Sequence, residues 1–115
     1  MKGIKKIKIG KYDRLWSLKV RARDEACLKC GRTENLAAHH VVRRSIKSTR
    51  LMVENGCSLC PSCHVFSHIF SAHKTPEMFI RWFKGRFPAR YRRIKEKEKE
   101  YCTEKQAIEL FKQEL

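Results

Sequence analysis

The sequence has no long hydrophobic run. None of its apolar stretches approaches the roughly 20 residues that a helix needs to cross a bilayer, so no membrane span is expected. Residues 1–10 alternate lysine with isoleucine and lack the continuous apolar stretch of a secretion signal, so an intracellular protein is expected, cytoplasmic or phage-encoded in a host cell. Repeats and long linkers are also missing, and 115 residues correspond to one compact domain with tails at most.

Acidic residues are also few, which leaves a strong positive charge. The 27 lysines and arginines outnumber the 12 aspartates and glutamates, giving a formal net charge of +15. Such a charge attracts polyanions, so nucleic acid is the first partner to consider. Residues 1–24 have nine basic and two acidic side chains, residues 25–73 have six and three, and residues 74–115 have twelve and seven. The excess therefore lies mainly on the two flanks of the chain.

Two groups of basic residues are candidates for contact with a phosphate backbone. One lies near the start of the chain and the other follows the first expected strand, and ordinary surface charge is the alternative interpretation of both. The candidates are Lys2, Lys5, Lys6, Lys8, Lys11, Arg43 and Arg44. The alternating lysines and glutamates of residues 95–100 are interpreted instead as a solvated face with local charge compensation.

Hydrophobic spacing and turn residues predict an α+β chain. A flexible arm or edge strand is expected over residues 1–11, followed by a helix over 14–24 that Asp13 caps, with Leu15, Leu18 and Ala22 at helical spacing. Strands are expected over 36–42 and 57–60, the second introduced by the turn dipeptide Asn55-Gly56.

Four further helices are expected after the second strand. Their predicted ranges are 61–72, starting at Pro61; 75–84, capped by Thr75 and stopped by Gly85; 88–101; and 104–114, with a Thr103/Gln106 capping box. On the second of them, Phe79, Trp82 and Phe83 line one face and are interpreted as core.

The six cysteines need an explanation, because disulfides are rare in intracellular proteins. Cys27 and Cys30 form one CxxC pair, and Cys60 and Cys63 form another. Two such pairs complete a tetrahedral four-cysteine zinc site, and the long gap between them leaves room for a functional element. A redox pair is the alternative, although one CxxC would suffice for it. The other two cysteines are expected to be a buried strand residue and a bystander, Cys57 and Cys102.

All five histidines lie close to these cysteines in sequence. His39 and His40 lie between the pairs, and His64 follows Cys63 directly. On a helix, His64 and His68 would share a face and could bind one ion together. His73 would point away from both and is expected outside the site. The combination predicts a functional site rather than isolated structural histidines.

Three segments together resemble the motif of the HNH endonuclease family. They are Leu36-Ala37-Ala38-His39-His40-Val41-Val42, Glu54-Asn55-Gly56, and Leu59-Cys60-Pro61-Ser62-Cys63-His64 with His68. The surrounding CxxC pairs resemble the zinc-stapled branch of that family, and the resemblance covers residues 27–68. It implies a small ββα-metal (His-Me finger) core over residues 25–73, between a basic arm and helix over 1–24 and a helical extension over 74–115.

The resemblance also implies catalytic roles. His40 resembles the general base that activates water, while His39, His64 and His68 resemble the ligands of a catalytic divalent ion such as Mg²⁺ or Mn²⁺. Asn55 resembles the residue that braces the loop between the strands. Neighbouring side chains on a strand face opposite ways, so His39 and His40 can serve one phosphate only if the strand bends or ends there. Such a small nuclease would suit a phage or mobile element.

Three functions stay open at this point. The first is a metal-dependent endonuclease that hydrolyses DNA phosphodiester bonds. The second is a non-catalytic zinc module that binds nucleic acid through its charge, which leaves the histidines unexplained. The third is a nuclease that depends on a homodimer or a partner protein, with Phe79, Trp82 and Phe83 of the C-terminal helices as the docking surface.

Overall fold

The computed structural model describes residues 9–115, so the candidate contacts Lys2, Lys5, Lys6 and Lys8 lie outside the described residues. In chain order the elements are α1 (Ile9–Asp24), β1 (Ala37–His40), α2 (Lys47–Arg50), the 3-10 turn η1 (Val53–Asn55), β2 (Gly56–Leu59), the π-helical turn η2 (Ser62–Phe66), α3 (Pro76–Arg86), α4 (Pro88–Glu98) and α5 (Glu104–Gln113). None of the helices in this part of the chain has the length and apolar character that crossing a bilayer requires.

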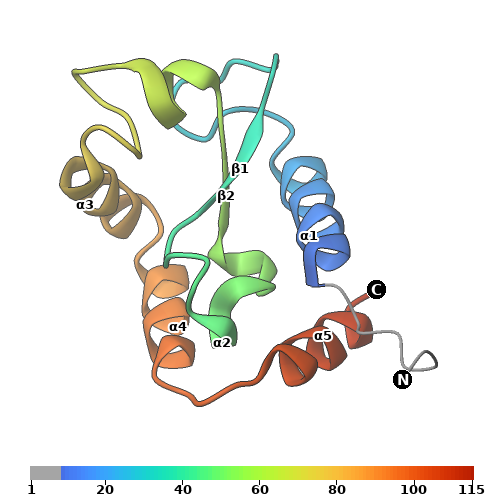
Figure 1. Ribbon diagram of the computed structural model, residues 1–115. Coiled ribbons are helices and arrows are strands. Elements are labelled where there is room, and N and C mark those ends of the chain that lie inside the picture. The colour runs from blue at the N-terminus through green and yellow to red at the C-terminus, as the bar shows by residue number, and fades with distance from the viewer. Residues whose placement is uncertain (1–8) are drawn as a thin grey trace.

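A two-stranded antiparallel sheet lies at the centre of the molecule. Ala37 of β1 pairs with Leu59 of β2, and His40 pairs with Gly56. Helix α1 lies on one side of the strands, and α3 and α4 lie on the other (Figure 1). Every residue of β2 is buried, because helices cover both of its faces. The mixed fold expected from the sequence, with two short strands among helices, is confirmed.

Two apolar clusters fill the space on either side of the sheet. The cluster on the α1 side consists of Trp16, Val20, Leu51, Ala107, Ile108 and Phe111. The cluster on the other side joins the metal-site cysteines to α3 and α4: Cys27, Val41, Val42, Cys57, Leu59, Cys60, Cys63, Ala72, Phe79, Phe83 and Ile94. The sheet is therefore the shared wall of two small cores.

Helix α1 starts earlier and buries a different face than expected. Residues 9–11 are helical, so the arm or edge strand does not extend to residue 11, and Asp13 lies inside the helix instead of capping it. The buried side chains are Trp16 and Val20, four residues apart, whereas Leu18 is 55 % exposed. The indole of Trp16 and the branched side chain of Val20 pack against the sheet. This contact determines which face of the helix points inward.

The expected helix over 61–72 is wrong. The chain makes only the π-helical turn η2, becomes extended at Ser67, and folds back on itself. The amide of Ala72 donates to the carbonyl of Cys63 (2.9 Å), and the amide of His73 donates to the carbonyl of His64 (3.0 Å). These bonds take the place of the backbone hydrogen bonds of a helix, because packing around the cysteines outweighs local helix propensity.

The C-terminal helices follow the sequence prediction more closely. Helix α3 runs through Gly85 to Arg86 and ends before Pro88, whose ring disfavours a helical residue in front of it. The hydroxyl of Thr75 bonds Ser71 and does not cap α3. Helix α4 ends at Glu98, three residues short of the expected Tyr101.

Two local interpretations of the C-terminal segment are confirmed. The capping box of α5 is present, with reciprocal bonds between Thr103 and Gln106. Lysines and glutamates of residues 95–100 pair at i,i+3 spacing: Lys95 with Glu98, Lys97 with Glu100, and Lys99 with Glu96.

The aromatic face of α3 is a core face, as predicted. Phe79 and Phe83 are 1 % and 0 % exposed, and Trp82 is half-buried. Phe79 and Phe83 belong to the same buried cluster as Cys57 and Leu59 of β2. The alternative prediction that these aromatic residues form an exposed docking surface is therefore wrong for Phe79 and Phe83, because the protein itself already covers both side chains.

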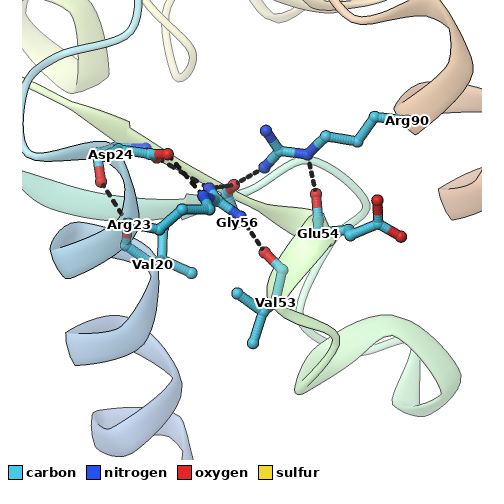
Figure 2. Close-up of polar contacts among 8 residues, drawn as sticks. Val20, Arg23, Asp24, Val53, Glu54, Gly56 and Arg90 are labelled. Carbon is cyan, nitrogen blue, oxygen red and sulfur yellow. Dashed lines mark hydrogen bonds and ion pairs between the residues drawn. The ribbon is translucent and has the colours of Figure 1, made fainter. Parts of the chain in front are cut away.

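Arginine side chains tie the start of β2 to the helices. Arg23 donates to the carbonyls of Val53 (2.9 Å) and Gly56 (2.6 Å), and Arg90 donates to the carbonyls of Glu54 (2.7 Å) and Gly56, so both guanidinium groups meet at one oxygen (Figure 2). Further carboxylate contacts balance this positive charge: Asp24 pairs with Arg23, and Glu54 pairs with Arg93. These arginines brace the backbone instead of adding free surface charge.

Gly56 allows α1 to approach β2 closely. A Cβ atom at this position would overlap the side chain of Val20 and lie 2.8 Å from Cζ2 of Trp16. We predict that Gly56→Ala lowers the free energy of unfolding by about 1–3 kcal/mol, the usual cost of overpacking. Chemical denaturation of the metal-loaded protein measures this change.

Gly85→Ala is the matched control. Gly85 lies inside α3, and a Cβ there would meet nothing within 4 Å. Alanine should therefore raise the free energy of unfolding by about 0.5–1 kcal/mol through its higher helix propensity. Equal effects of the two substitutions would contradict the close approach of α1.

Candidate functional site

Four cysteines gather at one end of the sheet. Cys27 and Cys30 lie on the turn between α1 and β1, and Cys60 and Cys63 lie where β2 passes into η2. Their Sγ atoms all lie within 4.8 Å of one another. Gly31 adopts a φ of +83° and donates its amide to the carbonyl of Cys27 (2.8 Å), which closes the first turn.

The environment of these thiols suits a divalent cation. Burial opposes ionisation of Cys27, but backbone amides of Cys60, Cys30 and Lys29 lower its pKa to about 7. Burial, together with the nearby Cys27, raises the pKa of Cys63. Four crowded sulfur atoms repel one another as thiolates unless a cation lies among them, and Zn²⁺ takes four sulfur ligands in a tetrahedron. The cluster is therefore compatible with zinc.

The remaining cysteines lie outside this cluster. Cys57 is completely buried in β2, where burial raises its pKa to about 12, so it is a buried residue of the second strand as expected. Cys102 is half-buried before α5, and its Sγ lies 3.3 Å from the carbonyl of Thr103.

A three-histidine cluster lies next to the cysteines. It consists of His39 at the end of β1, His64 in η2 and His73 before α3, with candidate ligand atoms within 4.8 Å of one another. The Nε2 atoms of His64 and His73 are 3.1 Å apart. The expectation that His73 points away is wrong, because the chain folds back after η2 and carries His73 to His64.

His68 lies elsewhere. Its side chain is exposed, and its Nε2 lies 3.3 Å from Nζ of Lys74. The structure therefore brings His39 and His64 together, as the sequence suggests, but with His73 in the place expected for His68. A helix would have put His64 and His68 on one face, and the extended backbone at Ser67 separates them.

Two histidines of the cluster, His39 and His64, are held neutral. Burial, followed by the charges of His64 and His73, lowers the pKa of His39 to about 3. Burial and His73 also lower the pKa of His64. Neutral imidazoles have a free lone pair for a metal ion, so the donor set fits a divalent cation at neutral pH.

His40 lies on the opposite face of β1. Its ring stacks on Trp16, with ring centroids 3.8 Å apart and planes at 11°. Its Nε2 lies 3.0 Å from the carbonyl oxygen of Arg50. A carbonyl only accepts, so Nε2 carries the proton and the lone pair of the neutral ring is at Nδ1. Burial is the main cause that lowers the pKa of His40 to about 4, which keeps this ring neutral.

Two contacts from α1 position His40. Asp13 binds the side chain of Arg50 through two hydrogen bonds of 3.0 and 2.7 Å, and the carbonyl of that arginine accepts from His40. Trp16 donates from Nε1 to the carbonyl of Met52 (2.8 Å) while stacking on the imidazole. Sequence reasoning missed both contacts, because they join segments more than 20 residues apart. The single tryptophan of this helix was the available signal.

Asn55 is fully buried between the strands. Its side chain accepts from the amide of Val42 (2.7 Å) and donates to the carbonyls of Val42 (3.0 Å) and Thr49 (3.1 Å). Its own carbonyl accepts from the amide of Val41 (2.8 Å). These bonds tie the loop after His40 to the start of β2.

The basic candidates that the structure describes are on the surface. Arg43 and Arg44 are exposed directly after β1, within four residues of His40. Lys11 is exposed on α1. Their positions leave the cationic groups free to meet a ligand from solvent.

Comparison with known proteins agrees with this geometry. The family model described as HNH endonuclease matches residues 27–68, which contain both cysteine pairs, β1 and β2. No curated protein and no solved structure matches the chain. The match confirms the resemblance to the HNH endonuclease family over the central segment of this chain, residues 27–68.

Proposed function

We propose that the protein is a metal-dependent endonuclease that hydrolyses phosphodiester bonds of DNA. The observation that carries this proposal is the position of a neutral, tautomer-fixed His40 next in sequence to the three-histidine cluster. The HNH match supports a nuclease, and the net charge of +15 supports a polyanionic substrate. The four-cysteine cluster stabilises the fold around these residues.

His40 is the proposed general base. With Nε2 donating to the carbonyl of Arg50, Nδ1 is the atom that accepts a proton from the attacking water. Stacking on Trp16 limits rotation of the ring, so the lone pair keeps its direction. Asn55 positions the base by tying the loop after β1, and it needs no contact with substrate for this role.

A divalent ion such as Mg²⁺ or Mn²⁺ is the proposed catalytic cofactor. His39, His64 and His73 would bind it according to the geometry, while the family resemblance favours His68 as the third ligand. When bound, the ion supplies positive charge that stabilises the phosphate and the leaving oxygen. Because His39 and His40 lie on opposite faces of β1, the scissile phosphate is expected at the end of the strand, where one phosphate could lie between the two faces.

Zinc in the four-cysteine cluster is the proposed structural cofactor. It would connect the turn of Cys27 to the end of β2 and thereby fix where η2 begins. Because His64 follows Cys63 in the chain, this zinc would also orient the three-histidine cluster. Arg43, Arg44 and Lys11 are proposed contacts with the DNA backbone, together with Lys5, Lys6 and Lys8.

Removal of one zinc ligand tests the structural site. Cys60→Ser should lower the zinc content measured by elemental analysis and reduce the midpoint of thermal unfolding, because a thiolate ligand is lost. Cys102→Ser is the control, since this cysteine lies outside the four-cysteine cluster. Unchanged zinc content in Cys60→Ser would refute the assignment of that ligand.

Plasmid cleavage tests the proposed activity. The purified protein should cleave supercoiled DNA with Mg²⁺ or Mn²⁺, and His40→Ala should slow cleavage by about 10²- to 10⁴-fold while the fold and DNA affinity are retained. Equal rates for the two proteins would remove His40 as the base. An inactive wild-type protein that still binds DNA would instead favour the non-catalytic zinc module.

The third ligand of the catalytic ion is tested by two matched histidine variants. Titration with Mn²⁺ should show an affinity loss of more than about tenfold in His73→Ala, since even groups that only support a ligand contribute about 10- to 100-fold. His68→Ala should bind Mn²⁺ like the wild type, because its exposed ring contacts Lys74. The reverse result would restore His68 as the ligand.

A further inference from the structure

The loop of residues 65–71 is tied at its base to both metal-binding clusters. The amide of Ala72 donates to the carbonyl of the zinc-site residue Cys63 (2.9 Å). The amide of His73 donates to the carbonyl of His64 (3.0 Å), so two members of the three-histidine cluster are also joined there. Any ligand that reaches the three-histidine cluster must therefore come close to this loop.

Hydrogen bonds within the loop give it a defined shape. The hydroxyl of Ser67 accepts from the amides of Ile69 and Phe70, both at 3.1 Å. Nζ of Lys74 donates to the carbonyl of Phe66 (3.1 Å). The backbone is therefore ordered before any ligand binds, and binding through this loop would cost little conformational entropy.

Two large apolar side chains point from the loop into solvent, and we call this pair the apolar tip. Its members are Phe66, which is 67 % exposed, and Ile69, which is 83 % exposed, although aromatic Phe70 in the same loop is half-buried against the core. Single exposed apolar residues are common, but two on one ordered loop beside a metal-binding cluster form a small apolar projection.

The charge around the apolar tip selects a polyanion as its partner. From Asn35 to Pro76 the only acidic residue is Glu54, and Arg93 neutralises it at 2.5 Å. Lys74 contacts the loop at the carbonyl of Phe66, and Lys29 lies over the ring of Phe70. Two lysines beside an apolar tip match duplex DNA, which presents phosphates outside and stacked bases inside.

We propose that the apolar tip is a wedge, in which Phe66 and Ile69 insert between neighbouring base pairs of duplex DNA beside the cleaved strand. The inference rests on the proposed function, because it takes DNA as the substrate. Apolar wedges of Phe and Ile unstack a base step and kink the duplex. At this site, the kink would turn a phosphate toward the end of β1.

Two measurements of duplex distortion test the wedge. Both use the complete zinc-loaded chain with His40→Ala, which leaves the loop unchanged. In the first, a nicked plasmid is closed by DNA ligase in the presence of protein, and insertion should leave the closed circles negatively supercoiled. In the second, a duplex containing 2-aminopurine is titrated without added divalent metal, and unstacking should raise its fluorescence. Because no divalent metal is added, this second measurement stays valid even if the His40→Ala variant retains some cleavage activity.

The apolar tip is removed by Phe66→Ser with Ile69→Ser. We expect this variant to lose both signals and to bind duplex DNA about tenfold more weakly, as when one base-stacking contact is lost. Because both side chains are exposed, the midpoint of thermal unfolding should stay the same. Phe66→Leu should retain the signals, since an apolar group can still insert.

Leu18→Ser with Leu115→Ser is the matched control. These leucines are 55 % and 65 % exposed and lie outside the loop, so both signals should persist. Signals that survive removal of the tip, or are absent from the parent protein, overturn the wedge. Tip-dependent binding to anionic vesicles without a DNA signal also overturns it and identifies a membrane as the partner.

The wedge and the proposed nuclease can fail separately. If the wild type cleaves no DNA with Mg²⁺ or Mn²⁺ but the tip-dependent unwinding persists, the nuclease fails and the wedge stands. If cleavage occurs and removal of the tip changes neither unwinding nor fluorescence, the nuclease stands and the wedge is overturned.

Discussion

The close contact between α1 and the start of β2 is the constraint on which the candidate site depends. It is possible because Gly56 has no side chain, which leaves space for Trp16 and Val20. The contact places the indole against His40, and Asp13 one turn earlier on the helix reaches Arg50. One helix position thus determines the tautomer, the orientation and the burial of the imidazole, because all three depend on neighbours that α1 supplies or holds.

The high positive charge has two separate physical roles. Part of it is used inside the protein, where the guanidinium groups of Arg23 and Arg90 bind backbone carbonyls around Gly56 and Arg50 binds Asp13. These cations replace the hydrogen bonds that a larger sheet would provide for the same carbonyls. The rest is on the surface, where exposed lysines and arginines face solvent and remain free to bind a polyanion.

The four-cysteine cluster and the three-histidine cluster form one connected unit. Cys63 and His64 are neighbours in η2, and their carbonyls accept from Ala72 and His73 across the base of the same loop. A metal ion at the cysteines would therefore restrain a histidine through one peptide bond and another through one hydrogen bond. With such an ion, a small chain would gain a more rigid site than its two modest apolar cores alone would support.

The sequence by itself indicated the resemblance of residues 27–68 to the HNH family, the two cysteine pairs, both strands and the capped last helix, because each depends on residue type and short-range spacing. Only the tertiary structure decided that His73 joins His64, that Trp16 faces His40, and that the chain after η2 is a loop instead of a helix. The physical reason is that each of these depends on contacts between distant segments. Packing around the cysteines and the sheet outweighs the local helix preference, which is worth only about 0–0.7 kcal/mol per ordinary residue.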